Sequence, residues 1–344
     1  MKRKEWLLLI LVVVVLGAAA AGMMWYRAAH APQNTPAAAQ KTEPELPPGT
    51  PSATLVITRD YGGEQLMKRA VPISQGDTVM DVLKREGGDV KTTYNGSFVE
   101  SINGLASAYK AGDSKSKPID WFFYVNGVMS DIGAGEYPVR TGDVITWDYH
   151  RWAFDTSAPA LIGVYPQPFV QHDEETNKAI ALAVMYAPGL QEQADQLAKA
   201  LSTARQTETK AVAWNEQLFA EGQPLIVLGD SKAYADSAFY QKLWEQKAMY
   251  GLFAHFTKNG IEATDISGNV VITDVKPDAG AIVATVHPET RKPLWFVGGN
   301  SSDAIARIVH TIASGQTADT PWTNSFGLLQ DGQETLRLPL GGTP

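Results

Sequence analysis

The sequence contains no cysteine among its 344 residues. This absence excludes disulfide bonds, thiolate metal sites, cysteine nucleophiles and the lipidated cysteine of a bacterial lipoprotein. Positive charge is also scarce, since 29 lysine and arginine residues stand against 37 aspartate and glutamate residues and give a formal charge of -8. An acidic chain has no general electrostatic attraction to nucleic acid, so we expect no nucleic-acid partner.

The histidines lack the spacing of a metal site, because no H-x-x-x-H or similar motif occurs. A surface or capping role is the ordinary expectation for each of them. His150 is the one histidine that we consider as a metal ligand, because Trp147 and Trp152 lie beside it in the sequence. We therefore predict no resident metal and no cofactor.

Residues 1–30 contain a membrane signal. Three basic residues at positions 2–4 precede an apolar run over 7–26, which would be about 30 Å long as a helix and would span one bilayer core. Basic residues before such a run place the amino terminus in the cytoplasm. We predict a single-pass anchor with the rest of the chain outside the cell. The alternative is a signal peptide cleaved near Ala31, which would give a secreted protein.

Residues 31–52 are rich in proline and have little to bury. Such a segment adopts extended conformations and would reach roughly 30 to 70 Å. We predict a spacer between the membrane segment and the first folded domain.

Residues 53–152 have the pattern of a small α+β domain of the β-grasp type. A short helix is expected to begin after Asp77 as its N-cap and to end at Gly87-Gly88. Strands are expected around it, because short runs of alternating or β-branched residues lie between turn signals. These strands are Thr54–Arg59, Lys68–Ile73, Phe98–Ile102, Trp121–Val125 and Val144–Tyr149.

Three motifs of this region carry a resemblance: residues 96–105, Trp121–Gly127 with its Asn-Gly turn, and Gly142–Ile145 followed by Trp147. Together they resemble the transcobalamin-like carboxy-terminal domain, a DUF4430-type module of bacterial surface proteins. The resemblance implies a β-grasp domain that binds a small organic ligand such as cobalamin and performs no chemistry on it. It therefore implies that the protein is not an enzyme.

The resemblance also implies that the ligand lies against loops that connect strands, next to aromatic residues. On that basis the predicted ligand-binding residues are Tyr94, Asn103, Trp121, Asn126, Met129 and Trp147. Along the central strand, alternation sends Trp121, Phe123 and Val125 to one face and Phe122 and Tyr124 to the other. We expect one face to be core and the other to meet solvent, a ligand or a neighbouring domain.

Residues 160–315 alternate strand and helix patterns, which predicts an α/β domain with a largely parallel sheet. Residues 316–344 are predicted to be a polar tail. The expected strands are Leu161–Tyr165, Ala179–Tyr186, Leu225–Leu228, Ile261–Thr264, Val270–Thr273 and a hairpin of Ala281–Val286 with Leu294–Val297. The expected helices run through Leu197–Ala204, Ala238–Gln246 and Ser302–Ile312.

Two short motifs of this second domain are candidates for a catalytic or anion-binding role. Gly229-Asp230-Ser231 after a strand is similar to the serine block of lipase-like esterases, although no Asp-x-x-His partner block occurs. Gly298-Gly299-Asn300-Ser301 before a helix could hold an anion, although it lacks a phosphate-loop lysine. We expect both to be turns with helix caps.

Three functions remain open at this point. The leading hypothesis is an anchored extracytoplasmic protein that holds a cobalamin-like or other small organic ligand through its first domain and passes it to a vitamin transporter. The alternative is a structural cell-surface module without a small-molecule ligand. An esterase that uses Ser231 ranks last.

Overall fold

The computed structural model describes residues 46–108, 118–171, 179–273, 276–315, 322–332 and 334–341. Leu46–Pro344 form one compact unit. The predicted membrane segment and residues 31–45 of the predicted spacer lie outside the described residues, so both stay predictions. Within the described ranges, no helix is both long enough and apolar enough to cross a bilayer.

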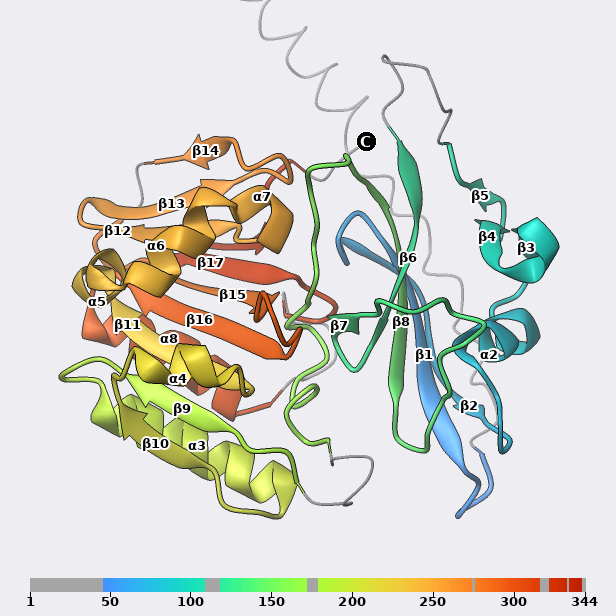
Figure 1. The fold of residues 1–344 in the computed structure, drawn as a ribbon, viewed down its shortest axis with the longest axis horizontal. Coiled ribbons are helices and arrows are strands. Elements are labelled where there is room, and N and C mark those ends of the chain that lie inside the picture. The colour runs from blue at the N-terminus through green and yellow to red at the C-terminus, as the bar shows by residue number, and fades with distance from the viewer. Residues whose placement is uncertain are drawn as a thin grey trace, which may run out of the picture. The chain divides into compact units, whose positions relative to one another are not determined.

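The first domain is built on a five-stranded mixed sheet in the order β2-β1-β8-β6-β7 (Figure 1). The strands are β1 (Ser52–Arg59), β2 (Glu64–Pro72), β6 (Ile119–Val125), β7 (Val128–Met129) and β8 (Val144–Arg151). β1 runs antiparallel to β2 and parallel to β8, and β8 runs antiparallel to β6. A separate small sheet contains β3 (Val90–Thr93), β4 (Phe98–Ile102) and β5 (Leu105–Ala106), and η1 (Tyr94–Gly96) is a single 3-10 turn.

Helix α2 (Val79–Glu86) covers one face of this sheet. Its N-cap is Thr78, one residue later than expected, and Thr78 and Asp81 form a capping box. Asp77 instead accepts hydrogen bonds from the Ser74 amide and the Arg85 guanidinium. The predicted N-cap, Asp77, was wrong. Both residue types suit the position, but it is the Thr78 side chain that accepts a hydrogen bond from the Asp81 amide.

The second domain contains a seven-stranded sheet in the order β10-β9-β11-β16-β15-β17-β18. Its strands are β9 (Ala183–Tyr186), β10 (Lys210–Ala213), β11 (Leu225–Asp230), β15 (Gly280–Val286), β16 (Pro293–Gly299), β17 (Gly327–Asp331) and β18 (Glu334–Leu338). The pairings from β10 to β16 are parallel, and those from β16 to β18 are antiparallel. The sheet is therefore mixed rather than largely parallel, because two hairpins form one half of it.

Alternation along β11 shows how the two faces of this sheet are covered. Ile226 and Leu228 face a core with α3 (Gln191–Arg205) and α8 (Ser302–Ala313). Leu225 and Val227 face a second core on the opposite side. That side is covered by α4 (Gln217–Glu221), α5 (Ser231–Asp236), α6 (Ala238–Glu245), α7 (Lys247–Tyr250) and the small sheet of β12 (Ala254–Thr257), β13 (Gly260–Thr264) and β14 (Val270–Ile272).

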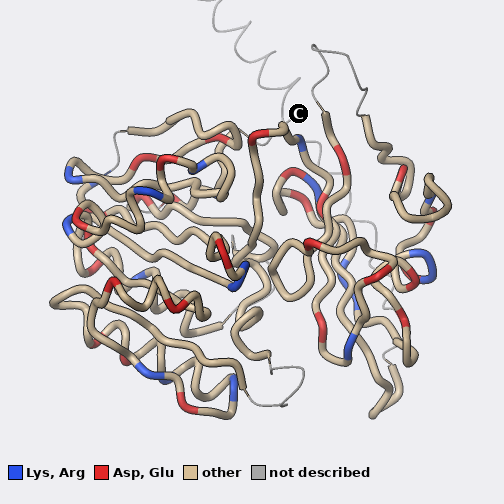
Figure 2. Tube along the Cα trace, viewed as in Figure 1, with Lys and Arg blue, Asp and Glu red and all other residues tan. Residues whose placement is uncertain are grey.

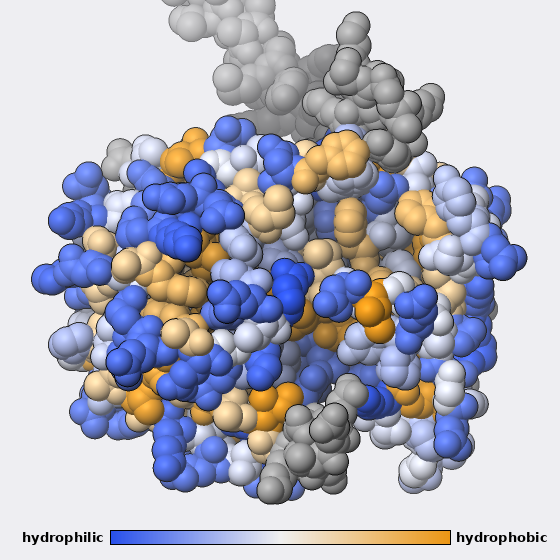
Figure 3. All heavy atoms as spheres, in the orientation of Figure 1, coloured by the Kyte–Doolittle hydropathy of each residue, from blue (hydrophilic) through white to orange (hydrophobic). Residues whose placement is uncertain are grey.

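Charged residues lie mainly outside the buried strands. In Figure 2 the tube through β15 and β16 is tan along its length, which agrees with their uncharged sequences. The visible surface in Figure 3 is mostly hydrophilic, with hydrophobic residues scattered between. Scattered apolar residues are normal for a soluble surface and mark no site by themselves.

Two expectations for the second domain need correction. Residues 161–165 form turns instead of a strand, and they are apolar because they are buried: Leu161 and Ile162 are fully covered, and the amides of Ile162 and Gly163 both donate to the Ser325 carbonyl. Residues 316–344 are not a polar tail, because they supply β17 and β18. Phe326, Leu328 and Leu329 are completely buried there.

Candidate functional site

Both faces of β6 pack against other parts of the structure, with Phe122 and Phe123 half-buried. Trp121 and Val125 belong to the core beneath α2. Tyr124 belongs instead to a core of the second domain, where its ring meets that of Phe326 edge to face at 5.3 Å and its hydroxyl donates to the Ala158 carbonyl at 2.9 Å. The partner of the second face is therefore the neighbouring domain, which was one of the three options that the sequence left open.

Two of the predicted ligand residues, Trp121 and Trp147, lie in the core of the first domain. Their exposed fractions are 6% and 2%. The indole of Trp121 donates to the Leu105 carbonyl at 3.0 Å. Neither ring is placed at the surface, so contact with a ligand would require the core beneath α2 to open.

Two predicted asparagines, Asn103 and Asn126, hold turns together. Both have positive φ, at 49° and 54°, which asparagine tolerates better than most residues. The amide group of Asn103 bonds to the backbone of Asp89 and Gly87. That of Asn126 accepts from the Val144 amide at 2.8 Å and donates to Asp143 at 2.7 Å. Their hydrogen-bonding groups are thus used within the domain.

The two remaining predicted residues lie apart from this core. Tyr94 is 81% exposed, and its ring meets Phe98 edge to face at 6.2 Å. Met129 lies on β7 and is the one member of the predicted set that lines the cleft described next. The structure does not bring the six residues together at one place, and a ligand role for each of them stays a prediction.

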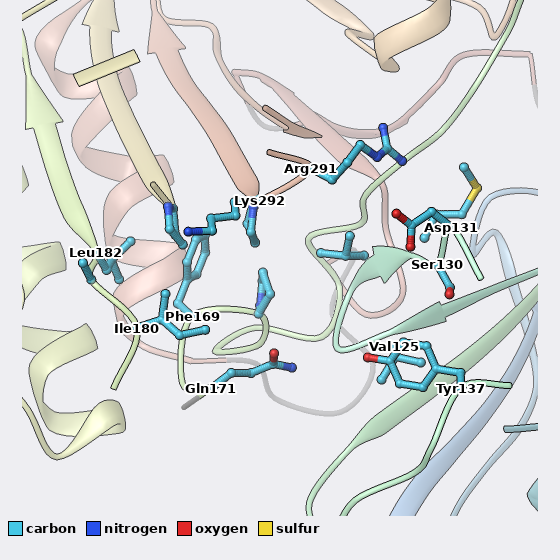
Figure 4. A pocket seen from close by; sticks show the side chains of 16 residues that line it. Val125, Ser130, Asp131, Tyr137, Phe169, Gln171, Ile180, Leu182, Arg291 and Lys292 are labelled. Carbon is cyan, nitrogen blue, oxygen red and sulfur yellow. The ribbon is translucent and has the colours of Figure 1, made fainter. Parts of the chain in front are cut away.

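A cleft of about 270 Å³, here called the β7 cleft, opens beside β7. One wall comes from the first domain through β7, the loop after it and Tyr137, and the other from the second domain (Figure 4). The lining residues are Val125, Val128, Met129, Ser130, Asp131, Tyr137, Pro168, Phe169, Gln171, Ile180, Ala181, Leu182, Pro224, Arg291, Lys292 and Pro293. Apolar side chains dominate, with polar and charged groups among them, as in most small-molecule sites.

The β15–β16 turn forms part of the second wall and is held by several hydrogen bonds. The His287 amide donates to the Lys292 carbonyl, and the Arg291 amide donates to the His287 carbonyl. The His287 ring lies 2.7 Å from the Phe219 carbonyl through Nε2, and its Nδ1 accepts from the amides of Glu289 and Thr290. This network assigns the proton to Nε2. Arg291 has a φ of 58°, which is unusual for a residue other than glycine.

A smaller hollow of about 80 Å³ lies next to Tyr61 and His150. The His150 ring stacks on Tyr61 at 4.3 Å and on Phe122 at 4.4 Å, and its Nδ1 lies 2.7 Å from the buried carboxylate of Asp148. Asp148 also accepts from the Thr58 hydroxyl and from the amides of Tyr61 and Gly62. These bonds fix the β1–β2 turn, which indicates a structural role.

Burial, with a further contribution from Asp148, raises the pKa of Tyr61 far above its usual range. The phenol therefore stays protonated and donates to the Arg151 carbonyl. Within the described ranges no group of three or more metal-ligating side chains occurs. The His150 ring is therefore hydrogen-bonded to one carboxylate and stacked on two aromatic rings, and it belongs to no cluster of three metal ligands among the described residues.

The Gly62 turn joins the two domains. Arg337 of β18 donates to the carbonyls of Gly62 and Thr323 at 2.7 and 2.8 Å, and the Asn324 side chain donates to that of Gln65. A Cβ atom at Gly62 would lie 1.8 Å from the Asn324 carbonyl oxygen. We call this set of contacts the joint. Beside the β7 cleft, the Met129 amide donates to the Pro159 carbonyl and the Leu161 amide donates to the Gly127 carbonyl.

The two short motifs of the second domain act as helix caps. The Asp230 carboxylate accepts from the Ala233 amide at the start of α5, and the Ser301 hydroxyl accepts from the Ala304 amide at the start of α8. Asn300 donates to the Lys276 carbonyl. Of the hydrogen bonds among described residues, none joins the Ser231 side chain to a histidine.

Comparison with known families places the first domain. Residues 76–151 match the family described as "Domain of unknown function (DUF4430)". The resemblance seen in the sequence is confirmed for this segment, which runs from just before α2 to the end of β8. No curated protein matches the chain.

Two solved structures show similarity to about a third of the chain. One is a Ruminococcus gnavus protein to which metal binding has been ascribed, at 15% identity and a TM-score of 0.22, covering 30% of this chain and 98% of that one. The other is haptocorrin in complex with Cbi, at 16% identity and a TM-score of 0.24, covering 33% of this chain. This chain spans 28% of haptocorrin.

Sequence reasoning missed the second wall of the β7 cleft. Phe169 was given no site role in the sequence analysis, and Arg291 and Lys292 were expected only as part of a hairpin turn. The adjacent pair of basic residues at that turn was the available signal.

Proposed function

We propose that the chain binds a small organic ligand in the β7 cleft. The observation that carries this proposal is the composition of the cleft: an apolar lining with Met129 and Phe169, polar groups among it, and walls from two domains. Sites between domains are a preferred location for small-molecule binding. In this proposal the first domain contacts the ligand through β7 and the loop after it, and not through the buried tryptophans.

The size of the cleft limits the ligand. A volume of about 270 Å³ lies at the lower end of ordinary ligand pockets. A corrinoid is several times larger than an amino acid, so a cobalamin-like ligand would place only one edge or side group in the cleft. Binding outside the cell and delivery to a vitamin transporter belong to the same proposal and depend on the anchor predicted for residues 1–30.

A titration tests the proposal directly. The protein comprises residues 46–344, the compact unit that contains all three hydrophobic cores. Tryptophan fluorescence and corrin absorbance are followed as hydroxocobalamin or cyanocobalamin is added, and the same protein is screened against smaller amphiphiles. If neither signal changes at high micromolar corrinoid, a cobalamin-like ligand is excluded. If no compound changes the fluorescence, the proposal itself is wrong.

A matched pair of methionine variants locates the site. Met129→Glu places a charge on the apolar lining of the β7 cleft and is expected to abolish binding. Met249→Glu makes the same change at a residue that is 46% exposed on α7 and does not line the cleft, so binding should persist. Equal effects of the two substitutions would place the ligand elsewhere.

A structural surface module is the second candidate. The observation in its favour is that Trp121 and Tyr124 are buried and Phe122 and Phe123 are half-buried against the two cores, so β6 has no fully exposed aromatic ring. Retention of residues 46–344 on purified cell walls, together with silence in every titration, would support this candidate. The esterase reading is tested by aryl-ester turnover and its loss in Ser231→Ala.

A further inference from the structure

The charged residues of the β7 cleft are arranged by sign. Arg291 and Lys292 come from the β15–β16 turn of the second domain, whereas Asp131 follows β7 on the opposite wall (Figure 4). Lys292 and Asp131 are exposed and Arg291 is half-buried. Of the ion pairs between described residues, none involves these three side chains. The described lining residues of the cleft thus include two cations and one anion that form no ion pair with another described residue.

The cations are held on a preformed support. The backbone of the turn is closed by bonds between His287 and Lys292, and the Thr290 hydroxyl donates to the Gly222 carbonyl at 2.7 Å. The positive φ of Arg291 costs conformational energy. The residue keeps this conformation because the surrounding hydrogen bonds fix the turn. A turn held in this way presents its cations without a large ordering cost on binding.

The local charge is opposite in sign to that of the whole chain. A formal charge of -8 repels anions in general. Selective binding of an anion therefore has to come from a local cluster, and Arg291 with Lys292 is such a cluster beside an apolar lining that includes Met129 and Phe169. We infer that the ligand of the β7 cleft is a soluble amphiphile with an anionic group, such as a carboxylate or sulfonate, next to an apolar body.

This inference rests on the proposed function and specifies its ligand class. The anionic group lies against the β15–β16 turn, where a guanidinium and an ammonium can donate charge-assisted hydrogen bonds. The apolar body lies against Met129 and Ile180, which are both half-buried. Asp131 on the opposite wall disfavours a second negative charge, so ligands with one anionic group are preferred.

Two dyes that differ in one group test the inference. 8-Anilinonaphthalene-1-sulfonate carries a sulfonate, and N-phenyl-1-naphthylamine has the same ring system without it. Both gain fluorescence in apolar sites, so their dissociation constants for residues 46–344 can be measured alike. Residues 1–45 are left out because their apolar run would itself bind the dyes. We expect the sulfonate to bind roughly threefold to tenfold more tightly, as one exposed charge-assisted contact provides.

Variants of the turn separate charge from shape. Arg291→Gly removes a cation while allowing the positive φ, and Lys292→Gln removes the other cation at similar length. Each substitution should raise the dissociation constant of the sulfonate dye roughly threefold to tenfold and leave that of the neutral dye unchanged. Asp131→Asn should lower the dissociation constant of the sulfonate dye roughly twofold to fivefold. Lys258→Gln, in the β12–β13 turn and outside the cleft lining, is the matched control and should change neither dye.

The outcomes distinguish the inference from the function beneath it. If neither dye binds, or if Met129→Glu leaves both bound, the proposed site is wrong. If both dyes bind equally and the charge variants change nothing, the site stands and the anionic ligand class is overturned. A loss of both dyes in Arg291→Gly, with an altered near-UV circular dichroism spectrum, would show a structural effect, and Lys292→Gln then decides between the two.

Discussion

The two faces of β6 are closed in different ways. The face with Trp121 is covered by α2 and neighbouring strands of the same domain. The face with Phe122 and Tyr124 is covered by the second domain, through residues such as Phe326. A strand of alternating aromatics therefore shows that two faces need partners, but its own pattern cannot show whether a partner is local or distant in the chain.

The chemistry of the two faces also differs. The core beneath α2 consists of apolar side chains. At the other face, the buried Asp148, His150 and Tyr61 are joined by hydrogen bonds and ring stacking. Apolar packing provides most of the stability of a core, whereas a hydrogen-bonded polar cluster requires one defined geometry. The first face therefore stabilises the domain, and the second fixes the β1–β2 turn, whose Gly62 carbonyl accepts a hydrogen bond from Arg337 of the second domain.

The largest effect is expected from Trp147→Ala, which removes a large ring from the α2 face. The free energy of unfolding should fall by about 3–5 kcal/mol, because the cavity cannot close fully. Urea unfolding of residues 46–344 measures this. Tyr94→Ala, at a residue that is 81% exposed in the same domain, is the control and should stay within about 0.5 kcal/mol. Equal losses would contradict the described core.

Gly62→Ala should break the joint. The added methyl group would meet the Asn324 carbonyl, and φ at this position is +73°, so we expect a loss of about 3 kcal/mol. Hydrogen exchange should show faster exchange at β17 and β18. Gly76→Ala has a similar positive φ with no atom within 4 Å, so it carries the backbone strain without the clash. Its loss should be about 1 kcal/mol, and an equal loss at Gly62 would argue against the contact.

Tyr124→Phe tests the second face with a minimal change. The ring remains, but the hydrogen bond to the Ala158 carbonyl is lost, which should cost about 1 kcal/mol and leave that carbonyl without its partner. Tyr165→Phe is a suitable comparison, because the Tyr165 hydroxyl makes no hydrogen bond with the described residues. The same urea series measures both, and a larger loss in Tyr165→Phe would contradict this assignment.

Acid should weaken the α2 face before the joint. A hydrogen bond from Arg85 lowers the pKa of Asp77, and hydrogen bonds from Thr78 lower the pKa of Asp81. Carboxylates whose pKa is lower in the folded state stabilise it above the unfolded pKa of about 4, and this contribution is lost as pH falls through the folded values. Asp81→Asn should flatten the pH dependence of unfolding below about pH 4. An unchanged profile would exclude the capping box as its source.

The smallest effect is expected from Arg291→Gly at the cleft. Relief of the positive φ is partly offset by the greater freedom of glycine in the unfolded chain, so the free energy of unfolding should rise by about 0.5 kcal/mol. Calorimetry of residues 46–344 without ligand measures the change. A fall in stability would mean that the Arg291 side chain stabilises the turn, and the dye experiment would then rest on Lys292→Gln.

Local signals predicted much of the fold. The strand at Phe98–Ile102, the hairpin of β15 and β16 and the helix after Ser301 are present as expected, because each depends on periodicity and caps within its own segment. The errors concern segments whose role is set by distant partners. Leu161–Tyr165 has a strand-like composition because it is buried, and β17 pairs with a strand made much earlier in the chain.

The candidate site was predictable only in part. Met129 follows an Asn-Gly turn in a motif that the sequence displays, so it could be selected. Trp121 and Trp147 have the composition of a ligand platform, yet the same rings serve as core, and periodicity does not distinguish these uses. Arg291 and Phe169 could not be assigned to the same cleft, because their proximity depends on Phe169 packing against Trp295 of β16, a contact between segments far apart in the chain.

The joint has a consequence for synthesis on the ribosome. The first domain can complete its α2 side soon after emerging from the exit tunnel, but Tyr124, Gln65 and Gly62 lack their partners until Phe326, Asn324 and Arg337 are translated. A nascent chain of this protein therefore carries an uncovered aromatic surface for most of its elongation. Chaperone engagement, or truncation products that stop near Gly315 and aggregate, would be the visible sign of that interval.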